Sequence, residues 1–406
     1  DEGTYLFEDP MSALDLLSMI RDISGEYQVE WPKGGAIKVT EKCNLQNLKL
    51  QIRKTRDWFS VNGEVAVDND MIIEIQDLME MLEGETQEYI PLNNGIYLRV
   101  SKALKLKLQK LKAISVSTTQ DKKSLTVGES RSLALLGITE EVESTDGDVE
   151  WEQRKKRLQD AGSFTPKVPK TFQAVFRDYQ QDGFKWIARL AHLGFGACLA
   201  DDMGLGKTIQ ALAILLDRAQ LGPALVVAPT SVCPGWLLEA ERFTPTLNFK
   251  TFNGDDRPKQ AEELSKRDVL LVSYALLQRE AKLLTSQHFA TVILDEAQFI
   301  KNLTTARAKA AFGLQADFKL ITTGTPIENR LSELYSLFNF LNPGLLGSYR
   351  SFFSSFVTAI ERDNSSHKLS LLKWLVSPFI LRRTKSEILD ELPEKTEILR
   401  YAQLSP

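Results

Sequence analysis

The chain has 406 residues, a formal net charge of −4, 43% hydrophobic residues and 26% charged residues. This composition is close to that of globular proteins and excludes collagen-like, disordered and disulfide-rich chains. No apolar run approaches the ~20 residues that a bilayer-spanning helix needs, so we expect no membrane span. The length predicts two or three domains.

Cysteine and histidine spacing gives little sign of a metal site or of disulfides. Cys43, Cys198 and Cys233 form no C-x-x-C pair, and the three histidines do not cluster with them. This pattern favours a reducing, cytoplasmic setting. The chain begins at Asp1 in an acidic stretch rather than with a basic, apolar leader, so we expect a fragment without a signal peptide.

Residues 1–150 are expected to form a small α+β domain. The expected elements are an opening helix through Leu14 and Ile20, a hairpin over 58–67, a helix over 71–82 and a second hairpin over 89–100. Asn62-Gly63 predicts the first turn, because this pair favours the positive φ of a type I′ hairpin. Asn93-Asn94-Gly95 predicts the second turn.

A basic helix follows, with Ser101 as its expected N-cap. Its leucines share one face, and its remaining surface carries Lys102, Lys105, Lys107, Lys110 and Lys112. Such a lysine face is ordinarily solvated, and contact with nucleic acid is the alternative.

A charge switch marks the expected boundary of the front domain. The acidic stretch 140–150 is followed by the basic stretch 154–157 and by two prolines, which predicts a linker over 151–170. Residues 1–150 carry the excess of negative charge, whereas residues 151–406 are net positive and are the better candidate for a polyanionic partner.

Beyond residue 170, short β-branched runs alternate with helical segments. This alternation predicts an α/β fold with a parallel sheet covered by helices. The candidate strands are Phe195–Ala200, Ala224–Ala228, Val269–Ser273, Thr291–Leu294 and Lys319–Thr322. Residues 348–378 are mostly of helical character.

Residues 200–208, ADDMGLGKT, have the character of a phosphate-binding loop between a strand and a helix. Glycines allow backbone N–H groups to surround phosphate oxygens at a helix N-terminus, and Lys207 can reach the β and γ phosphates. Thr208 would bind magnesium through its hydroxyl. The strict pattern has glycine at position 201, where this chain has Asp201.

Residues 292–302, VILDEAQFIKN, form an apolar run that ends in two acids. Asp295 at a strand end beside a phosphate loop can bind the magnesium shell. Glu296 can orient or deprotonate the attacking water. Together with the loop, this segment predicts an ATP hydrolase whose catalytic residues are Lys207, Asp295 and Glu296.

Five further segments carry a family resemblance. They are FRDYQQDGFKWI (176–187), LVVAPTSVCPGW (225–236), LLVSY (270–274), LITTGTPIENRLSELYSLFNFLNPGLLG (320–347) and FILRRTKSEILDELPEKTE (379–397). Together with the phosphate-binding loop and the acidic segment 292–302, they resemble the first motor lobe of the SWI/SNF-like ATPases. These are helicase-like DNA translocases of the second helicase superfamily. Generic helicases lack the last segment. The resemblance covers roughly residues 170–406.

The resemblance implies a domain order for the chain. It implies an accessory domain over 1–150, a RecA-like P-loop NTPase lobe over 171–347, a helical insertion over 348–380 and a brace segment over 381–406 that leads to a missing second lobe. Asp57-Trp58-Phe59 and LNNGIYLRV resemble the accessory domain of some large bacterial members. This points to a bacterial, nucleoid-associated protein.

The resemblance also implies residue roles. Gln180, with Arg177, would read the adenine, and the phosphates of ATP would lie against Asp202, Met203, Gly204, Leu205, Gly206, Lys207 and Thr208. One strand of duplex DNA would contact Thr230, Ser231, Trp236, Ser273, Tyr274, Lys301, Asn302 and Thr323. Thr323 and Thr325 would link the ATP state to the DNA face. Gln298 replaces the commoner histidine after the acidic pair, and Gly235 replaces the usual asparagine before the tryptophan.

The function that the resemblance implies is ATP-dependent, duplex-DNA translocation that remodels protein–DNA complexes. ATP and magnesium are the expected cofactors, and duplex DNA and a nucleoprotein target are the expected partners. Without a second lobe to supply arginines, the chain is expected to be a weak, DNA-stimulated ATPase. The alternatives are an RNA or single-strand helicase and a non-catalytic ATP-binding scaffold.

Overall fold

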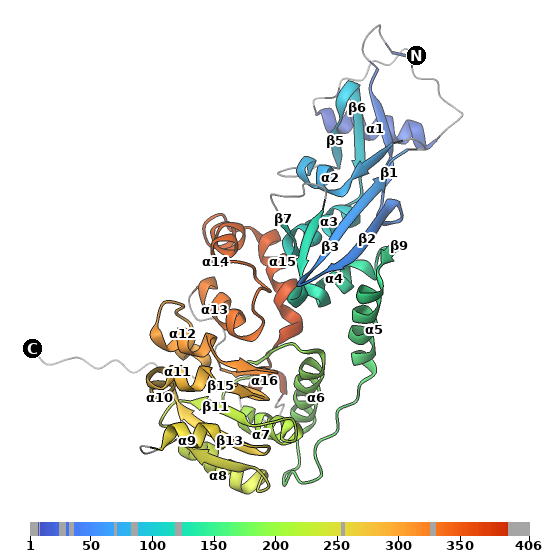
Figure 1. The fold of residues 1–406 in the computed structure, drawn as a ribbon. Helices are drawn as coiled ribbons and strands as arrows, with labels where there is room; N and C mark the ends of the chain where they lie inside the picture. Colours follow the sequence, from blue (N-terminus) through green and yellow to red (C-terminus); the bar gives the residue numbers. More distant parts are fainter. Residues whose placement is uncertain are drawn as a thin grey trace, which may run out of the picture. The chain divides into compact units, whose positions relative to one another are not determined.

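The computed structural model describes residues 7, 9–23, 30–31, 36–68, 71–82, 88–117, 124–252, 256–324 and 330–388. The chain divides into two units, which Figure 1 shows in sequence colours. One unit contains residues 1–163 and 343–375, and the other contains residues 164–342 and 376–406. Within the described part, no helix is long and apolar enough to cross a membrane.

The second unit is an α/β domain. Its strands are β10 (Ala197–Leu199), β11 (Ala224–Ala228), β12 (Asn248–Thr251), β13 (Asp268–Ser273), β14 (His288–Phe289), β15 (Thr291–Asp295), β16 (Gln315–Ala316), β17 (Lys319–Thr322) and β18 (Ile380–Leu381). Its helices are α6 (Asp178–Leu193), α7 (Lys207–Arg218), α8 (Cys233–Phe243), α9 (Arg257–Glu262), α10 (Tyr274–Arg279), α11 (Ala281–Thr285), α12 (Ala306–Phe312), α13 (Leu331–Leu341) and α16 (Lys385–Ile388). The short turns η4 (Ala297–Ile300) and η6 (Ser377–Phe379) complete it.

Seven of these strands form one parallel sheet, in the order β12-β13-β11-β15-β17-β10-β18. The five strands expected from the sequence are confirmed, because continuous apolar runs are typical of strands covered on both faces. Since all strands are parallel, the loops after β10, β15 and β17 leave the same edge of the sheet. That edge carries the candidate active site.

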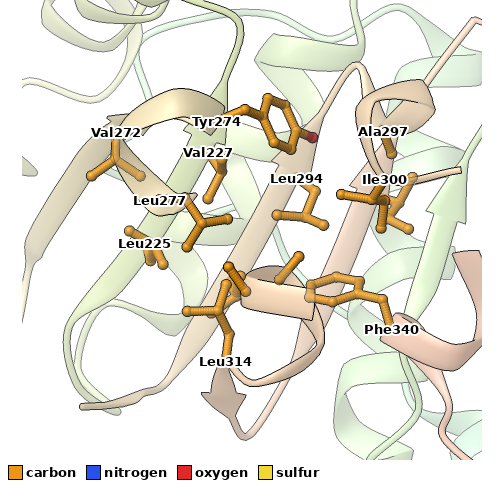
Figure 2. Packing of buried hydrophobic residues seen from close by; sticks show 14 of the residues in the cluster. Leu225, Val227, Val272, Tyr274, Leu277, Leu294, Ala297, Ile300, Leu314 and Phe340 are labelled. Carbon is orange, nitrogen blue, oxygen red and sulfur yellow. The ribbon is translucent and has the colours of Figure 1, made fainter. Parts of the chain in front are cut away.

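Figure 2 shows how one face of this sheet is packed. Alternate residues of the central strands, including Leu225, Val227 and Leu294, are fully buried against Leu277 of α10 and Phe340 of α13. This dry packing holds the strand ends in a fixed register, which is what a site shared by several strands requires.

Asp268 at the start of β13 ties the edge strand β12 to the sheet. Its carboxylate accepts hydrogen bonds from Asn248 Nδ2 (2.7 Å), Lys250 Nζ (2.9 Å) and the backbone N–H of Ser265 (2.8 Å). Burial alone would raise the pKa of Asp268, but these hydrogen bonds outweigh burial and lower the pKa below 3.8.

We expect Asp268→Ala to lower the free energy of unfolding by about 2 kcal/mol at neutral pH, because it removes the acceptor of three hydrogen bonds, one of them from a charged lysine. The folded-state pKa is depressed, so this contribution is present above pH 3.8 and is lost as the pH falls through the folded-state value. Urea unfolding at pH 7 and at pH 3 measures it. The exposed Glu263→Ala is the control, and an equal difference at both pH values would contradict the assignment.

The first unit is an α+β domain. Its strands are β1 (Lys38–Cys43), β2 (Leu48–Thr55), β3 (Trp58–Ala66), β4 (Ile72–Glu74), β5 (Tyr89–Pro91), β6 (Ile96–Val100), β7 (Val116–Ser117), β8 (Leu125–Gly128) and β9 (Ser144–Gly147). Its helices and helical turns are α1 (Pro10–Asp22), η1 (Leu45–Asn47), α2 (Ile75–Met81), η2 (Asn93–Gly95), α3 (Lys102–Ile114), η3 (Glu129–Arg131), α4 (Ser132–Thr139), α5 (Val149–Ser163), α14 (Tyr349–Phe352), η5 (Phe353–Arg362) and α15 (Ser366–Val376). The strands form a sheet β1-β6-β5 and a sheet β7-β8-β3-β2-β9 with β4 beside β3.

The predicted turn at Asn62-Gly63 is wrong. Both residues lie inside β3, opposite Gln51 and Leu50 of β2, and the hairpin turns at residues 56–57 instead. Glycine is needed at position 63 because β3 passes close to β2 there, not because the chain turns. An added Cβ would lie 2.7 Å from the carbonyl oxygen of Lys49. The second predicted hairpin is confirmed, with Gly95 at φ +72°.

The predicted linker over 151–170 is wrong in its first part. Residues 149–163 form helix α5, which buries Trp151, Leu158 and Ala161 at helical spacing. The ring of Trp151 packs edge-on against Phe59, with centroids 5.2 Å apart. Because charged residues stand between these apolar positions, the apolar face of the helix is not recognisable in the sequence.

Residues 348–375 of the expected helical insertion belong to the first unit rather than to the α/β domain. The buried guanidinium of Arg131 donates to the carbonyl oxygens of Leu345 (2.8 Å) and Ile114 (2.6 Å). It therefore joins the segment just before the insertion to the end of α3. The insertion is helical, as expected.

The lysine face of α3 is not wholly solvated. The Ser101 side chain caps the helix as expected, accepting from the backbone N–H of Leu104. Lys107, however, is buried and pairs with Glu141 at 2.7 Å. Its burial and this ion pair make Lys107 a structural residue rather than a free cation for nucleic acid, and burial also lowers its pKa.

Candidate active site

The loop between β10 and α7 is shaped to surround an anion. Gly204 and Gly206 have φ angles of +85° and +76°, in the region that favours glycine. Gly206 is the N-cap of α7, so the helix begins at Lys207 and its first backbone N–H groups have no partner within the helix. The loop, which turns at two glycines, therefore leads directly into the positive end of a helix.

Lys207 lies over this loop. Its Nζ donates to the carbonyl oxygens of Asp201 (2.8 Å) and Asp202 (3.3 Å). Burial lowers the pKa of Lys207, and the negative charges of Glu296 and Asp295 act in the opposite direction. The structure thus brings the predicted lysine and both predicted acids into one electrostatic site.

Asp295, at the end of β15, is held by three donors. Its Oδ1 accepts from Thr322 Oγ1 (2.6 Å) and from the backbone N–H of Glu296 (3.0 Å), and its Oδ2 accepts from Trp236 Nε1 (2.8 Å). The residue is only 7% exposed. A carboxylate offers about four acceptor positions, so one remains, on Oδ2.

Glu296 has an unusual backbone and an unpaired side-chain atom. Its φ and ψ are +49° and +57°, a left-handed conformation that costs a non-glycine residue about 1–3 kcal/mol. Its Oε2 is buried and has no hydrogen-bond partner among the described residues. Strain and an unpaired buried carboxylate oxygen at one residue are typical of a reactive group.

Gln180, the predicted base-reading residue, is bonded to the phosphate loop itself. Its Oε1 accepts from the backbone N–H of Arg177 (3.0 Å), and its Nε2 donates to the carbonyl oxygen of Leu205 (3.3 Å). The hydroxyl of Tyr179 donates to the same carbonyl at 3.1 Å. The exposed side chain of Arg177 lies at the start of α6.

The other predicted phosphate residues lie in the loop and in the first turn of α7. Leu205 is buried and anchors the loop, whereas Met203 is 62% exposed. Thr208 is half-buried directly after Lys207, in the first turn of α7. The phosphate loop is thus anchored by the buried Leu205, while Met203 of the same loop is exposed to solvent.

Three side chains predicted to contact DNA are buried. Trp236 is 1% exposed and Tyr274 is 3% exposed, and their polar atoms face Asp295: the hydroxyl of Tyr274 donates to the Asp295 carbonyl oxygen at 2.8 Å. Figure 2 shows the Tyr274 ring within the buried cluster. Thr323 is fully buried and its Oγ1 donates to Gln298 Oε1 at 3.4 Å. These side chains cannot touch a DNA backbone in this structure.

The remaining predicted DNA residues differ in their accessibility. Thr230, Ser231 and Asn302 are exposed. Ser273 caps α10, accepting from the backbone N–H of Leu276, and Lys301 pairs with Glu333 at 3.3 Å. Thr325 lies outside the described residues.

Sequence reasoning missed the groups that orient the acids and the loop. Thr322 and Trp236 hold the carboxylate of Asp295, and Arg383 pairs with the carboxylate of Asp201. The only available signal was the departure from the strict loop pattern at position 201. A buried aspartate needs a partner, but the sequence does not say which of the 50 lysines and arginines supplies it.

Comparison with known proteins gives consistent matches. YwqA of Bacillus subtilis, whose name describes an ATP-dependent helicase or translocase, is 42% identical over 248 residues, covering 59% of this chain and 27% of that protein. The lymphoid-specific helicase of Homo sapiens is 36% identical over 259 residues, covering 58% of this chain and 31% of that protein. The chain thus spans less than a third of either relative.

Solved structures match the same part of the chain. The SWI2/SNF2 ATPase core of Sulfolobus solfataricus, solved in complex with double-stranded DNA, is 43% identical with a TM-score of 0.52, covering 57% of this chain and 49% of that one. The expected fold of an SWI/SNF-like ATPase lobe is therefore confirmed. The family model of the SNF2-related domain matches residues 179–406, more than half of the chain. On this match and on the geometry of the loop and the two acids, the chain belongs to the SNF2-related domain family.

Proposed function

We propose that this chain is the nucleotide-binding part of an ATP-dependent translocase that moves on double-stranded DNA and remodels protein–DNA complexes. The observation that carries the proposal is the convergence of Lys207, Asp295 and the unpaired Oε2 of Glu296 at one edge of the sheet. A structural ion cluster has no need of a strained glutamate with an unpaired buried oxygen.

ATP with magnesium fits the residues present. The loop offers the N-terminus of α7 to phosphate oxygens, and Lys207 can exchange its carbonyl partners for them. Thr208 and the remaining acceptor position of Asp295 would hold the magnesium ion or its water shell. When bound, magnesium neutralises charge on the phosphates.

The protein's own groups then have distinct roles. Lys207 binds the β and γ phosphates, and Asp295 is kept in one orientation by its three donors. Glu296 accepts the proton of the attacking water at Oε2. Gln180 and Arg177 read the adenine, and the Gln180 hydrogen bond to Leu205 connects base binding to the phosphate loop.

Duplex DNA is the proposed track. Thr230, Ser231 and Asn302 are exposed groups of the kind that bind phosphates without reading sequence. Ser273 ends β13, which pairs with β11 just before Thr230, and Lys301 precedes Asn302 in the chain. The SWI2/SNF2 core from Sulfolobus solfataricus, which this chain resembles, was solved with double-stranded DNA. The target of remodelling is proposed to be a nucleoprotein complex.

ATP hydrolysis measured without nucleic acid and with duplex DNA, single-stranded DNA or RNA tests this function. We expect duplex DNA to stimulate best. Thr230→Ala combined with Ser231→Ala should raise the duplex concentration for half-maximal stimulation about fivefold, since two phosphate contacts are lost, and leave the basal rate unchanged. Better stimulation by single strands or RNA would favour a helicase, and nucleotide binding without hydrolysis would favour a scaffold.

A further inference from the structure

Arg383 forms a bidentate ion pair with the residue that departs from the strict phosphate-loop pattern. Its Nε donates to Asp201 Oδ1 at 3.0 Å and its Nη2 donates to Oδ2. The Asp201 side chain is fully buried, and that of Arg383 is 13% exposed. Breaking such a pair from one side leaves a buried, uncompensated charge.

The same guanidinium also contacts two helices that frame the loop. Its Nη1 donates to the carbonyl oxygen of Tyr179 in α6, and it lies 5.2 Å from the centroid of the Tyr179 ring. Its Nη2 lies 3.3 Å from Oε1 of Gln210 in α7. Gln210 in turn donates from Nε2 to the carbonyl oxygen of Gly206. One side chain thus connects the loop, the adenine-reading helix and the helix that begins at Lys207.

The backbone around Arg383 is docked on the loop as well. β18 pairs in parallel with β10 through only two residues and is the last strand of the sheet. Beyond this pairing, the backbone N–H of Asp202 donates to the Arg383 carbonyl oxygen (3.0 Å), and the backbone N–H of Lys385 donates to Asp202 Oδ2 (3.1 Å). A two-residue edge strand is weak alone, so the side-chain contacts of Arg383 carry much of this attachment.

Gly183 of α6 leaves the space that the side chains of Gln210 and Arg383 occupy. A Cβ added to Gly183 of α6 would lie 2.0 Å from Gln210 Oε1 and 2.9 Å from Arg383 Nη2. Position 183 therefore accepts no side chain while Gln210 and Arg383 are in place.

We propose that Arg383 is a positioning residue for the phosphate loop, and that docking of residues 380–385 on the loop is a condition for nucleotide binding. Asp201 is held from both sides, through its carboxylate by Arg383 and through its carbonyl oxygen by Lys207. Without Arg383, an unpaired carboxylate lies beside the site where phosphates bind and repels them. This inference rests on the proposed function, because it assumes that the loop binds a nucleotide.

The test is the affinity of the whole chain for a fluorescent N-methylanthraniloyl ADP with magnesium, measured with thermal unfolding of each variant. We expect Arg383→Ala to weaken binding about tenfold and Arg383→Lys, which keeps the charge but loses the bidentate geometry, to weaken it severalfold. The adjacent, exposed Arg382 supplies the matched control, and Arg382→Ala should bind like the unaltered chain.

Removing the Asp201 carboxylate distinguishes a positioning role of Arg383 from a general loss of structure. Asp201→Asn combined with Arg383→Ala should bind the probe more tightly than Arg383→Ala alone, because the repelling charge is gone. Equal binding by folded Arg383→Ala and the unaltered chain would overturn the inference, as would purely additive effects of the two substitutions. If Arg383→Ala does not fold, unchanged binding by Arg383→Lys overturns it. Failure of the unaltered chain to bind the probe would instead reject the proposed function.

Discussion

Glu296→Gln should lower the rate of ATP hydrolysis by about a thousandfold while leaving nucleotide affinity within a few fold of the unaltered protein. General-base catalysis contributes about 10²–10⁴ in rate, and an amide cannot accept the proton of the attacking water. The substitution keeps the volume and the hydrogen-bonding shape of the side chain. Steady-state hydrolysis with duplex DNA and binding of fluorescent ADP measure the two quantities separately.

The geometry explains why this residue, rather than another acid nearby, is expected to be the base. Asp295 has three of its acceptor positions occupied, whereas Oε2 of Glu296 has no partner among the described residues. Glu296, with its left-handed backbone, directly follows the end of β15. The packed core around β15 stabilises the fold enough to keep this strained conformation.

Glu239 of α8 supplies a demanding control. It is a half-buried carboxyl whose pKa is raised, first by burial and then by the negative charge of Asp295, so it is itself a conceivable acid–base group. We expect Glu239→Gln to hydrolyse ATP at close to the normal rate. If Glu239→Gln abolished hydrolysis and Glu296→Gln did not, the assignment of the base would be wrong.

The α/β domain was predictable because its strands are buried on both faces. Continuous runs such as Ala224–Ala228 appear only where no polar face is needed, and the structure reproduces that strand to the residue. In the first unit, by contrast, the same kind of local reasoning failed at Gly63. A glycine required by the nearby carbonyl of Lys49 looks in sequence like a glycine required by a turn.

The predicted DNA residues show a second limit of sequence reasoning. A motif fixes residue type and order, but not whether a side chain points out of the fold or into it. Trp236 and Tyr274 have polar atoms that suit a phosphate contact, yet both atoms are used by Asp295 inside the protein. Only residues at loop surfaces, such as Thr230 and Ser231, remain available.

The supporting contacts of the site could not be predicted because they join residues far apart in the chain. Arg383 and Asp201 are 182 positions apart, and Trp236 and Asp295 are 59 apart. Such pairs are set by strand order in the sheet and by helix packing, which leave no local periodicity. The extra aspartate at 201 was visible, but its meaning depended on where β18 returns to the sheet.

Trp236→Phe should lower the rate of ATP hydrolysis by between about 10- and 100-fold and should raise the magnesium concentration needed for half-maximal activity. Substitutions of groups that orient metal ligands typically have effects of this size. Phenylalanine preserves most of the buried aromatic volume but removes the Nε1–H that Asp295 Oδ2 accepts at 2.8 Å. Hydrolysis measured over a range of magnesium concentrations, at saturating ATP, gives both numbers.

Trp151→Phe is the matched control for this substitution. Trp151 is as deeply buried as Trp236, but its Nε1 has no hydrogen-bond partner among the described residues, and it lies in the first unit against Phe59. Both substitutions shrink a buried indole to the same extent, but only Trp236→Phe removes a hydrogen bond to Asp295 and should change the magnesium dependence. A parallel loss of activity in both variants, or an unchanged magnesium requirement in Trp236→Phe, would show that Trp236 acts through packing alone. The expected result instead assigns the motif that runs into α8 a role in holding Asp295, the proposed magnesium ligand.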